Sequence, residues 1–413
     1  MSEKPKSNSK LLFIIFITAF IDLLGVGIII PIIPALFFEG DGFLVGAYSE
    51  NTTAVLYGFL LAAYPLMQFF GAPVLGALSD KYGRKPVLSI ALIGTFVGYL
   101  LFAYGVLNQN LWLLYIGRLL PGFTGGNISI VTSSIADISD KESRTKNFGL
   151  VGMAFGLGFV IGPSIGGILS DPSILPWFDL HVPFVFTAIL TLVNIILVQL
   201  NFRETLKEKI ATKVNVFKGI ENIFTSFLKP ELRSVFTIVL LLSVGFTFYT
   251  NFFSAYLYLK FDFSTKDVGF LYGYVGIWLA FTQGFLVRIM SKKFKPKQIL
   301  VFSIPLLALG LGMIMLPTKG WMFYLVNPIV AIFYGLTFPN MTSLVSSQVD
   351  ETLQGSILGI NQSMSSFGQV LTISVGGFIL AQGITFPLIA SSSIIFLAFI
   401  VFLFTKHRMK YDS

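Results

Sequence analysis

Two charged residues lie deep within apolar stretches of this 413-residue chain, and they are the first candidates for chemistry. Asp22 lies about midway along the apolar stretch 11–37, and Arg118 lies within the stretch 111–136. An ionised carboxylate in an apolar surrounding is costly unless it is paired, hydrated or protonated. We therefore expect Asp22 to bind and release a proton; the alternative is a structural carboxylate that caps a neighbouring helix.

Other kinds of chemistry have few residues to draw on. The chain has no Cys, and its two His residues, His181 and His407, lie outside the apolar stretches. Thiolate nucleophiles, disulfides and histidine-ligated metal centres are therefore not expected. The chain also lacks the phosphate-binding pattern G-x-x-x-x-G-K-[ST]. We predict no enzyme activity, no cofactor and no metal site.

The composition excludes a water-soluble protein. Charged residues make up 12% of the chain and hydrophobic residues 54%, and the mean hydropathy is +0.81. A soluble domain carries about 25% charged residues, so this chain cannot cover a soluble surface. A nucleic-acid partner is not expected despite the pI near 9.4. A multi-pass integral membrane protein remains.

The elements that would position Asp22 and Arg118 are membrane-spanning helices, each needing roughly 20 apolar residues. We predict an all-α protein with twelve such spans in the lipid bilayer. The predicted spans are 11–37, 54–78, 87–107, 111–136, 148–170, 183–201, 233–259, 268–289, 298–316, 321–345, 356–381 and 385–405.

The distribution of basic residues predicts the orientation. Twenty-four of the 28 Lys and Arg residues fall on one side of the predicted topology. Because positive loops stay in the cytoplasm, we expect both termini there. The long loop 202–232 divides the chain into two six-helix bundles, 1–201 and 233–413. A helix within this loop either lies at the membrane interface or packs under the bundle.

The loop after the second span carries the most specific pattern in the chain. Residues 76–88 read G-x-L-x-D-x-x-G-R-K-x-x-L, in which Asp80 and Arg84 are the charged positions. With Asp137 they can form a cytoplasmic charge cluster that latches one conformation. A solvated salt bridge worth under about 1 kcal/mol is the alternative, so the latch requires partial burial. The pattern resembles the signature loop of the major facilitator superfamily.

The fifth span carries a second pattern, G-x-x-x-G-P-x-x-G-G over residues 158–167. Glycines four residues apart allow close helix packing, and proline bends a helix. The string resembles the antiporter motif of drug:proton exchangers in that superfamily. The residues expected to pack or bend the helices are Gly76, Gly83, Gly158, Gly162, Pro163, Gly166 and Gly167.

Residues 22–34 and 114–125 also resemble motifs of this subfamily, so the likeness to bacterial tetracycline:proton antiporters covers residues 11–205. It implies two pseudo-symmetric bundles in which Arg118 helps drive protonation and deprotonation of the carrier carboxylate; a static pairing is the alternative. The chain departs from that family at Gly98, where an acid is expected, and in spans 8 and 9, which lack the matching His and acid.

These patterns predict a proton-coupled transporter that exports drug-like or amphipathic small molecules by alternating access. A proton-coupled importer or facilitator of a metabolite or siderophore on the same fold is the alternative. We expect a monomer in a bacterial inner membrane, with protons and a small-molecule substrate as its partners. Aromatic and amide residues within the spans are candidates to line the substrate cavity: Tyr64, Gln68, Phe248, Asn251, Phe252, Gln283 and Asn361.

Overall fold

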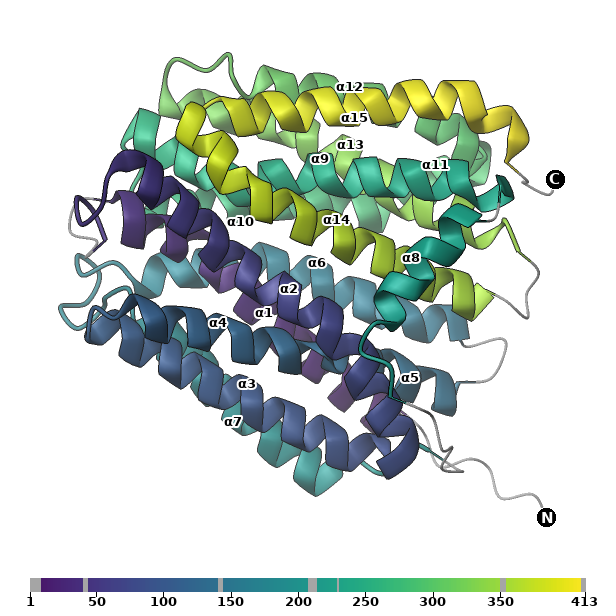
Figure 1. Cartoon of the computed structure of the whole chain (residues 1–413), viewed down its shortest axis with the longest axis horizontal. Helices are drawn as coiled ribbons and strands as arrows, with labels where there is room; N and C mark the ends of the chain where they lie inside the picture. Colours follow the sequence, from purple (N-terminus) through teal and green to yellow (C-terminus); the bar gives the residue numbers. More distant parts are fainter. Residues whose placement is uncertain are drawn as a thin grey trace. The chain divides into compact units, whose positions relative to one another are not determined.

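The computed structural model describes residues 9–39, 44–139, 144–206, 214–228, 230–349 and 354–409. Helices dominate these ranges and no strand occurs in them (Figure 1). Ten of the helices described are long and apolar enough to cross a membrane. The prediction of an all-α membrane protein is therefore confirmed.

The chain divides into two compact units. The first contains Met1–Ile29 and Leu66–Phe217, and the second contains Ile30–Pro65 and Lys218–Ser413. Helices α1 (Ser9–Phe38) and α2 (Glu50–Tyr82) therefore contribute to both units. The predicted pair of bundles, 1–201 and 233–413, stays a prediction, because the second unit also takes in residues 30–65.

Beyond the parts of α1 and α2, the first unit is built from five further helices and one short turn. They are α3 (Arg84–Leu107), α4 (Leu111–Thr124), the 3₁₀ turn η1 (Gly125–Asn127), α5 (Ile128–Ile138), α6 (Arg144–Leu169) and α7 (Val182–Asn201). The predicted span 111–136 is thus interrupted: α4 and α5 are separated by η1 at a Gly-Gly-Asn sequence.

The second unit contains the remaining helices. They are α8 (Lys218–Leu228), α9 (Pro230–Phe261), α10 (Thr265–Phe281), α11 (Val287–Lys293), α12 (Pro296–Met313), α13 (Phe323–Ser346), α14 (Gln354–Gln382) and α15 (Phe386–Thr405). A π-helical turn, η2 (Thr282–Leu286), joins α10 to α11 within the predicted span 268–289. Helix α8 packs against α9 and α14. It occupies the loop in which a helix was predicted.

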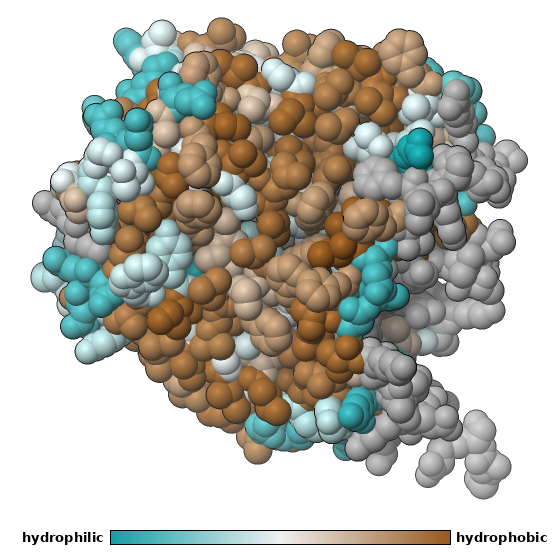
Figure 2. All heavy atoms as spheres, in the orientation of Figure 1, coloured by the Kyte–Doolittle hydropathy of each residue, from teal (hydrophilic) through white to brown (hydrophobic). Residues whose placement is uncertain are grey.

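Large apolar side chains are exposed along the outer faces of the helices. Figure 2 shows hydrophobic residues over much of the visible face, with hydrophilic residues gathered toward the left and right edges. Trp112, Leu200 and Phe404 are each at least 75% exposed. Water would not favour such a surface, whereas lipid hydrocarbon solvates it.

Glycines bring α1 and α6 close together in the first unit. A Cβ atom added to Gly162 would lie 2.8 Å from the Cα of Gly27 and 2.8 Å from the carbonyl oxygen of Leu24. A Cβ on Gly158 would lie 2.9 Å from backbone atoms of Leu23 and Leu24. Small residues therefore let the two backbones touch near Asp22. Pro163 lies within α6 beside this contact.

The contact predicts the effect of adding one methyl group. Gly162→Ala should lower the thermal unfolding midpoint of the detergent-solubilised protein, because overpacking against backbone costs about 1–3 kcal/mol. Gly359→Ala in α14 is the matched control, since a Cβ there meets nothing within 4 Å. The control should be neutral or slightly stabilised, as Ala favours a helix over Gly by about 1 kcal/mol. Equal midpoints for the two variants would contradict the close packing.

Candidate functional site

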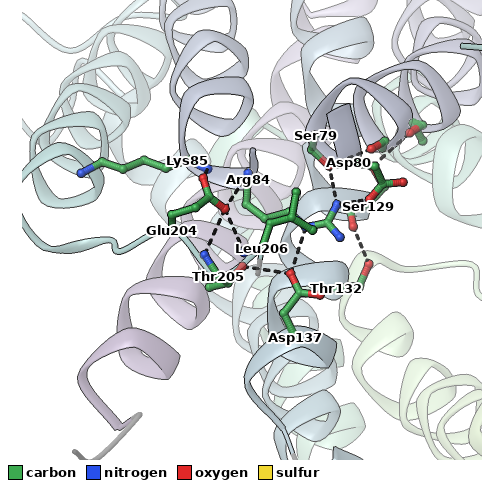
Figure 3. A network of polar contacts seen from close by, with 12 residues as sticks. Ser79, Asp80, Arg84, Lys85, Ser129, Thr132, Asp137, Glu204, Thr205 and Leu206 are labelled. Carbon is green, nitrogen blue, oxygen red and sulfur yellow. Dashed lines mark hydrogen bonds and ion pairs between the residues drawn. The ribbon is translucent and has the colours of Figure 1, made fainter. Parts of the chain in front are cut away.

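The predicted charges at the turn between α2 and α3 are in contact (Figure 3). Arg84 Nη1 lies 2.6 Å from Asp80 Oδ1, and Arg84 Nε lies 3.0 Å from Asp137 Oδ2. Arg84 Nη1 also donates to Ser79 Oγ at 2.6 Å. The guanidinium therefore joins α2 and α5 through α3. We call Ser79, Asp80, Arg84 and Asp137 the charge cluster.

The charge cluster is partly buried, which the latch interpretation requires. The side chain of Arg84 is 6% exposed, that of Asp137 21% and that of Asp80 32%. Asp137 Oδ2 also accepts a hydrogen bond from Thr205 Oγ1 at 3.0 Å. Asp137 is thus the more buried acid and has two partners from distant segments. Removing one member of such a pair costs more than removing one member of a fully solvated pair, because the remaining charge stays partly buried without its partner.

Glu204, which follows α7, caps the N-terminus of α3. Its Oε1 accepts from the backbone N–H of Arg84 at 2.9 Å, and its Oε2 accepts from that of Lys85 at 3.2 Å. The first backbone N–H groups of a helix have no partner within the helix and favour a negative charge. Helix α3 has no side-chain cap from Gly83, so Glu204 supplies one.

The glycine of the signature pattern makes this cap possible. Gly83 has φ of 111°, in the left-handed region that favours glycine. A Cβ atom there would lie 2.6 Å from Glu204 Oε2. The glycine therefore allows the chain to turn and leaves room for the Glu204 carboxylate. Gly76, in contrast, has only an ordinary contact of 3.4 Å, with Ser129 Oγ.

Hydrogen bonds set the ionisation of Glu204. Partial burial by itself would raise the pKa of the carboxyl, but backbone N–H donors from Leu206, Arg84, Lys85 and Thr205 outweigh it and hold the pKa below its usual value. The charged form is the one that accepts these bonds. Glu204 therefore stays ionised as the pH falls, until its lowered pKa is reached.

Asp22 lies in the first unit beside the break in the fourth predicted span. Its Oδ2 accepts a hydrogen bond from Asn127 Nδ2 at 2.7 Å. Asp22 is half-buried, and Asn127 is fully buried, at 0% exposure. One amide therefore holds the carboxylate, an arrangement that suits a group that gains and loses a proton.

Arg118, the other deep charge, is buried within α4 at 6% exposure. Helix α4 directly precedes the 3₁₀ turn η1, which contains Asn127. Gly117 beside it touches the backbone of Phe102, because an added Cβ would lie 2.8 Å from Phe102 N. Helices α3 and α4 therefore pack closely beside Arg118, whose role in proton coupling stays a prediction.

The residues predicted to line a substrate cavity take up different positions. Gln68 donates to the carbonyl oxygen of Gly125 at 3.1 Å and so supports the break. Phe248 and Phe252 are buried, at 3% and 1% exposure. Asn251 donates to its own helix at Thr247 O, 3.1 Å away. A role of these four residues in a substrate cavity stays a prediction.

The other three candidates are half-buried. Tyr64 lies in α2, and Gln283 lies in the π-helical turn η2. Asn361 of α14 lines a small hollow in the second unit between α9, α13 and α14. The lining residues are Val239, Leu242, Phe338, Met341, Thr342, Asn361 and Ser365.

Aromatic rings stand beside this hollow. Phe246 and Tyr334 stack with ring centroids 3.6 Å apart, and the Phe338 centroid lies 4.3 Å from that of Tyr334. The lining is apolar apart from one carboxamide and two hydroxyl groups. Such a wall suits a flat apolar surface that carries few hydrogen-bonding groups.

The sequence did not predict the roles of three residues in these contacts: Asn127, Glu204 and Thr205. Each acts through a partner more than 60 positions away, as the pairs Asn127 with Asp22 and Thr205 with Asp137 illustrate. A polar residue beside Gly125-Gly126 in an apolar span was the available signal for Asn127.

Comparisons with known proteins agree with the geometry. Residues 15–373 match the Major Facilitator Superfamily. The chain is 32% identical over 386 residues to the class H tetracycline resistance protein of Pasteurella multocida, covering 92% of this chain and 91% of that protein. It is 26% identical over 414 residues to the quinolone resistance protein NorA of Staphylococcus aureus, covering 97% and 98%.

Solved structures show the same fold. The crystal structure of the human organic anion transporter MFSD10 superposes with a TM-score of 0.73 at 19% identity, covering 96% of this chain and 99% of that one. A likeness at this identity shows the fold. The expected resemblance to a transporter superfamily is confirmed by the sequence matches.

The lowered pKa of Glu204 gives a pH-dependent prediction. Its contribution to stability is present above the usual pKa of 4.5 and is lost as the pH falls through the lower folded-state pKa. Glu204→Gln should therefore reduce the loss of thermal stability on acidification. The measurement is the unfolding midpoint in detergent from neutral to acidic pH.

The matched control for this test is Glu221→Gln, which removes an exposed ion pair with Lys218 whose acid is 52% exposed. The control should follow the wild-type pH profile closely. If the Glu204→Gln profile coincides with those of the wild type and the control, the cap does not contribute to the pH dependence of stability.

Proposed function

This chain belongs to the Major Facilitator Superfamily, and we propose that it is a proton-coupled exporter of drug-like, amphipathic small molecules. The relatives named for tetracycline and quinolone resistance support export of such compounds. The protein is a multi-pass integral membrane protein. We place it in a bacterial inner membrane with both termini in the cytoplasm, acting as a monomer.

The observation that carries the proton-coupling proposal is the contact of Asp22 with Asn127. Asp22 is the deep acid of the described spans, and a single amide donor at 2.7 Å stabilises its charged form. In an apolar surrounding the neutral acid is the cheaper state. These opposed effects allow Asp22 to alternate between the two states, with Arg118 as the charge that favours proton release.

The proton gradient supplies enough energy for export. One proton moving down 100 mV releases about 2.3 kcal/mol, and each pH unit adds about 1.36 kcal/mol. A hundredfold concentration ratio of a neutral solute requires about 2.7 kcal/mol. One proton for each solute molecule therefore suffices for a useful ratio.

The wall formed by α9, α13 and α14 is the proposed contact for the apolar part of the substrate. Asn361 would hydrogen-bond a polar substituent, while the rings of Phe246, Tyr334 and Phe338 lie beside the hollow. Tyr64 and Gln283 remain candidates for the rest of the cavity. This division assigns proton binding to the first unit and apolar recognition to the second.

Everted membrane vesicles with a proton gradient, acid inside, test the function. Addition of tetracycline, norfloxacin or ethidium should dissipate the gradient for at least one compound, because export here moves substrate into the vesicle and protons out. Asp22→Asn should reduce the rate of gradient dissipation at least tenfold. Asp179→Asn, which changes an exposed acid, should leave that rate unchanged. Both variants must be present in the membrane at wild-type amounts.

The same assay separates the competing interpretations. Silence of the wild-type protein across the compound panel would overturn the exporter proposal. Proton release from the vesicles driven by a metabolite moving out of them would instead support an importer on this fold. Wild-type coupling in Asp22→Asn would remove Asp22 as the proton carrier and leave export itself standing.

We further propose that the charge cluster is a latch that stabilises one conformation of the transport cycle. Asp137 is its more buried acid and accepts from both Arg84 and Thr205. Asp137→Asn should weaken the latch by about 1–2 kcal/mol, which corresponds to roughly a five- to thirtyfold change in the conformational equilibrium. Turnover should fall while substrate affinity stays within about twofold.

Asp80→Asn is the comparison variant for the latch. Asp80 makes one ion pair with Arg84 and is 32% exposed, so its loss should weaken the latch by less than about 1 kcal/mol. The turnover rate should therefore be highest in the wild type, lower in Asp80→Asn and lowest in Asp137→Asn. The opposite ranking, or unchanged turnover in both variants, would argue against a latch at this position.

A further inference from the structure

The break in the fourth predicted span is held firmly by α2. Gln68 donates to the Gly125 carbonyl at 3.1 Å, and Ser129 Oγ donates to the Ala72 carbonyl at 3.0 Å. A Cβ atom on Gly126 would lie 2.4 Å from Ala72 N. Short 3₁₀ segments within a helix often mark functional positions. Here the break fixes the backbone from which Asn127 projects.

Asn127 has one satisfied and one unsatisfied side-chain group. Its Nδ2 donates to Asp22 Oδ2 at 2.7 Å, whereas its Oδ1 is buried and has no hydrogen-bond partner among the described residues. A buried acceptor without a partner is costly, and in a native structure it calls for an explanation. The free acceptor is part of the same planar amide that already contacts Asp22.

We propose that Asn127 is a positioning residue that partners Asp22 in both of its protonation states. A carboxamide presents donors on one side and an acceptor on the other. The Nδ2 group donates to the charged carboxylate. When Asp22 has bound a proton, a half-turn of the amide lets Oδ1 accept from the new O–H. The inference rests on the proposed function of Asp22 as the proton carrier.

This role explains why an amide stands at this position. An apolar side chain would leave either form of Asp22 without a partner in an apolar surrounding. A basic side chain would stabilise the charged form alone and oppose protonation. A group that both donates and accepts holds the carboxyl in one place while its charge changes, so the proton can bind and leave without displacing α1.

The neighbours of Asp22 leave few other groups to fill this role. Tyr99 of α3 lies against α1, because a Cβ on Gly25 would be 2.0 Å from its hydroxyl oxygen. Helix α6 presents Gly158 and Gly162, and α7 presents Thr187 near Gly25. Among these contacts in the described part of the first unit, Tyr99 is the titratable group beside α1, and Arg118 is the buried cation of α4.

Infrared titration of the purified full-length protein tests the proposal without any transported compound. The carbonyl stretch of a protonated carboxylic acid that disappears in Asp22→Asn is the Asp22 signal. The variants are Asn127→Val and Asn127→Thr, which have the same shape and differ in whether a hydroxyl group can donate and accept. Asn127→Ala and Asn127→Ser form a second pair, for use if the larger side chains prevent folding.

The proposal predicts two changes in the variant without a hydroxyl group. In Asn127→Val the midpoint of Asp22 protonation should move about one pH unit upward, because the charged form loses more than the neutral form does. The carbonyl stretch should also move to higher frequency, since the acid O–H loses its acceptor. Asn127→Thr should move less than Asn127→Val in both measurements, because its hydroxyl group can donate and accept but is one bond shorter than the amide.

The outcomes separate this inference from the proposed function. If the wild-type protein has no signal that Asp22→Asn removes, Asp22 does not titrate, and both proposals are overturned. If the Asp22 signal is present but its midpoint and frequency in Asn127→Val are the same as in the wild type, the role of Asn127 is overturned and that of Asp22 stands.

Discussion

Hydrocarbon cannot form hydrogen bonds, so each polar group of a membrane-spanning chain must find its partner within the chain. Several deep polar side chains here meet that requirement in pairs, such as Thr18 with Asn194 at 3.0 Å and Tyr249 with Asn327 at 2.6 Å, whereas the Oδ1 atom of Asn127 does not among the described residues. Asp22 also has a partner, but its charge can be removed by a proton. Because the surrounding cannot stabilise that charge, a single amide has a large influence on it.

Close backbone packing makes these short polar contacts possible. Gly27 and Gly162 bring α1 against α6, and Gly126 brings the break in the fourth span against Ala72 of α2. With bulkier residues the helices would stand farther apart, and Gln68 could not reach the Gly125 carbonyl. The glycines and the polar groups therefore act together. The glycines determine how closely the helices approach, and that distance allows the polar groups to form hydrogen bonds.

Helix α5 connects the proposed proton site at Asp22 to the charge cluster. It begins directly after Asn127, and Asp137 lies near its end. Ten residues at about 1.5 Å each separate the two positions by about 15 Å. A rigid helix thus has one end at Asp22 and the other at Arg84 and Thr205. Both ends involve an acid and a partner from another helix.

Local patterns in the sequence were sufficient to determine the membrane class, most of the helical spans and the signature motifs, because apolar length, charge position and glycine spacing are local properties. They did not show the 3₁₀ turn within the span 111–136 or the π-helical turn within the span 268–289. Asp80, Arg84 and Asp137 could be grouped because their span ends fall on the same predicted side. Only the tertiary structure revealed that Glu204 caps the N-terminus of α3, that Gln68 donates to the Gly125 carbonyl and that Asn127 donates to Asp22. Those contacts join residues 120, 57 and 105 positions apart, and side-chain partners at such separations depend on how the helices pack.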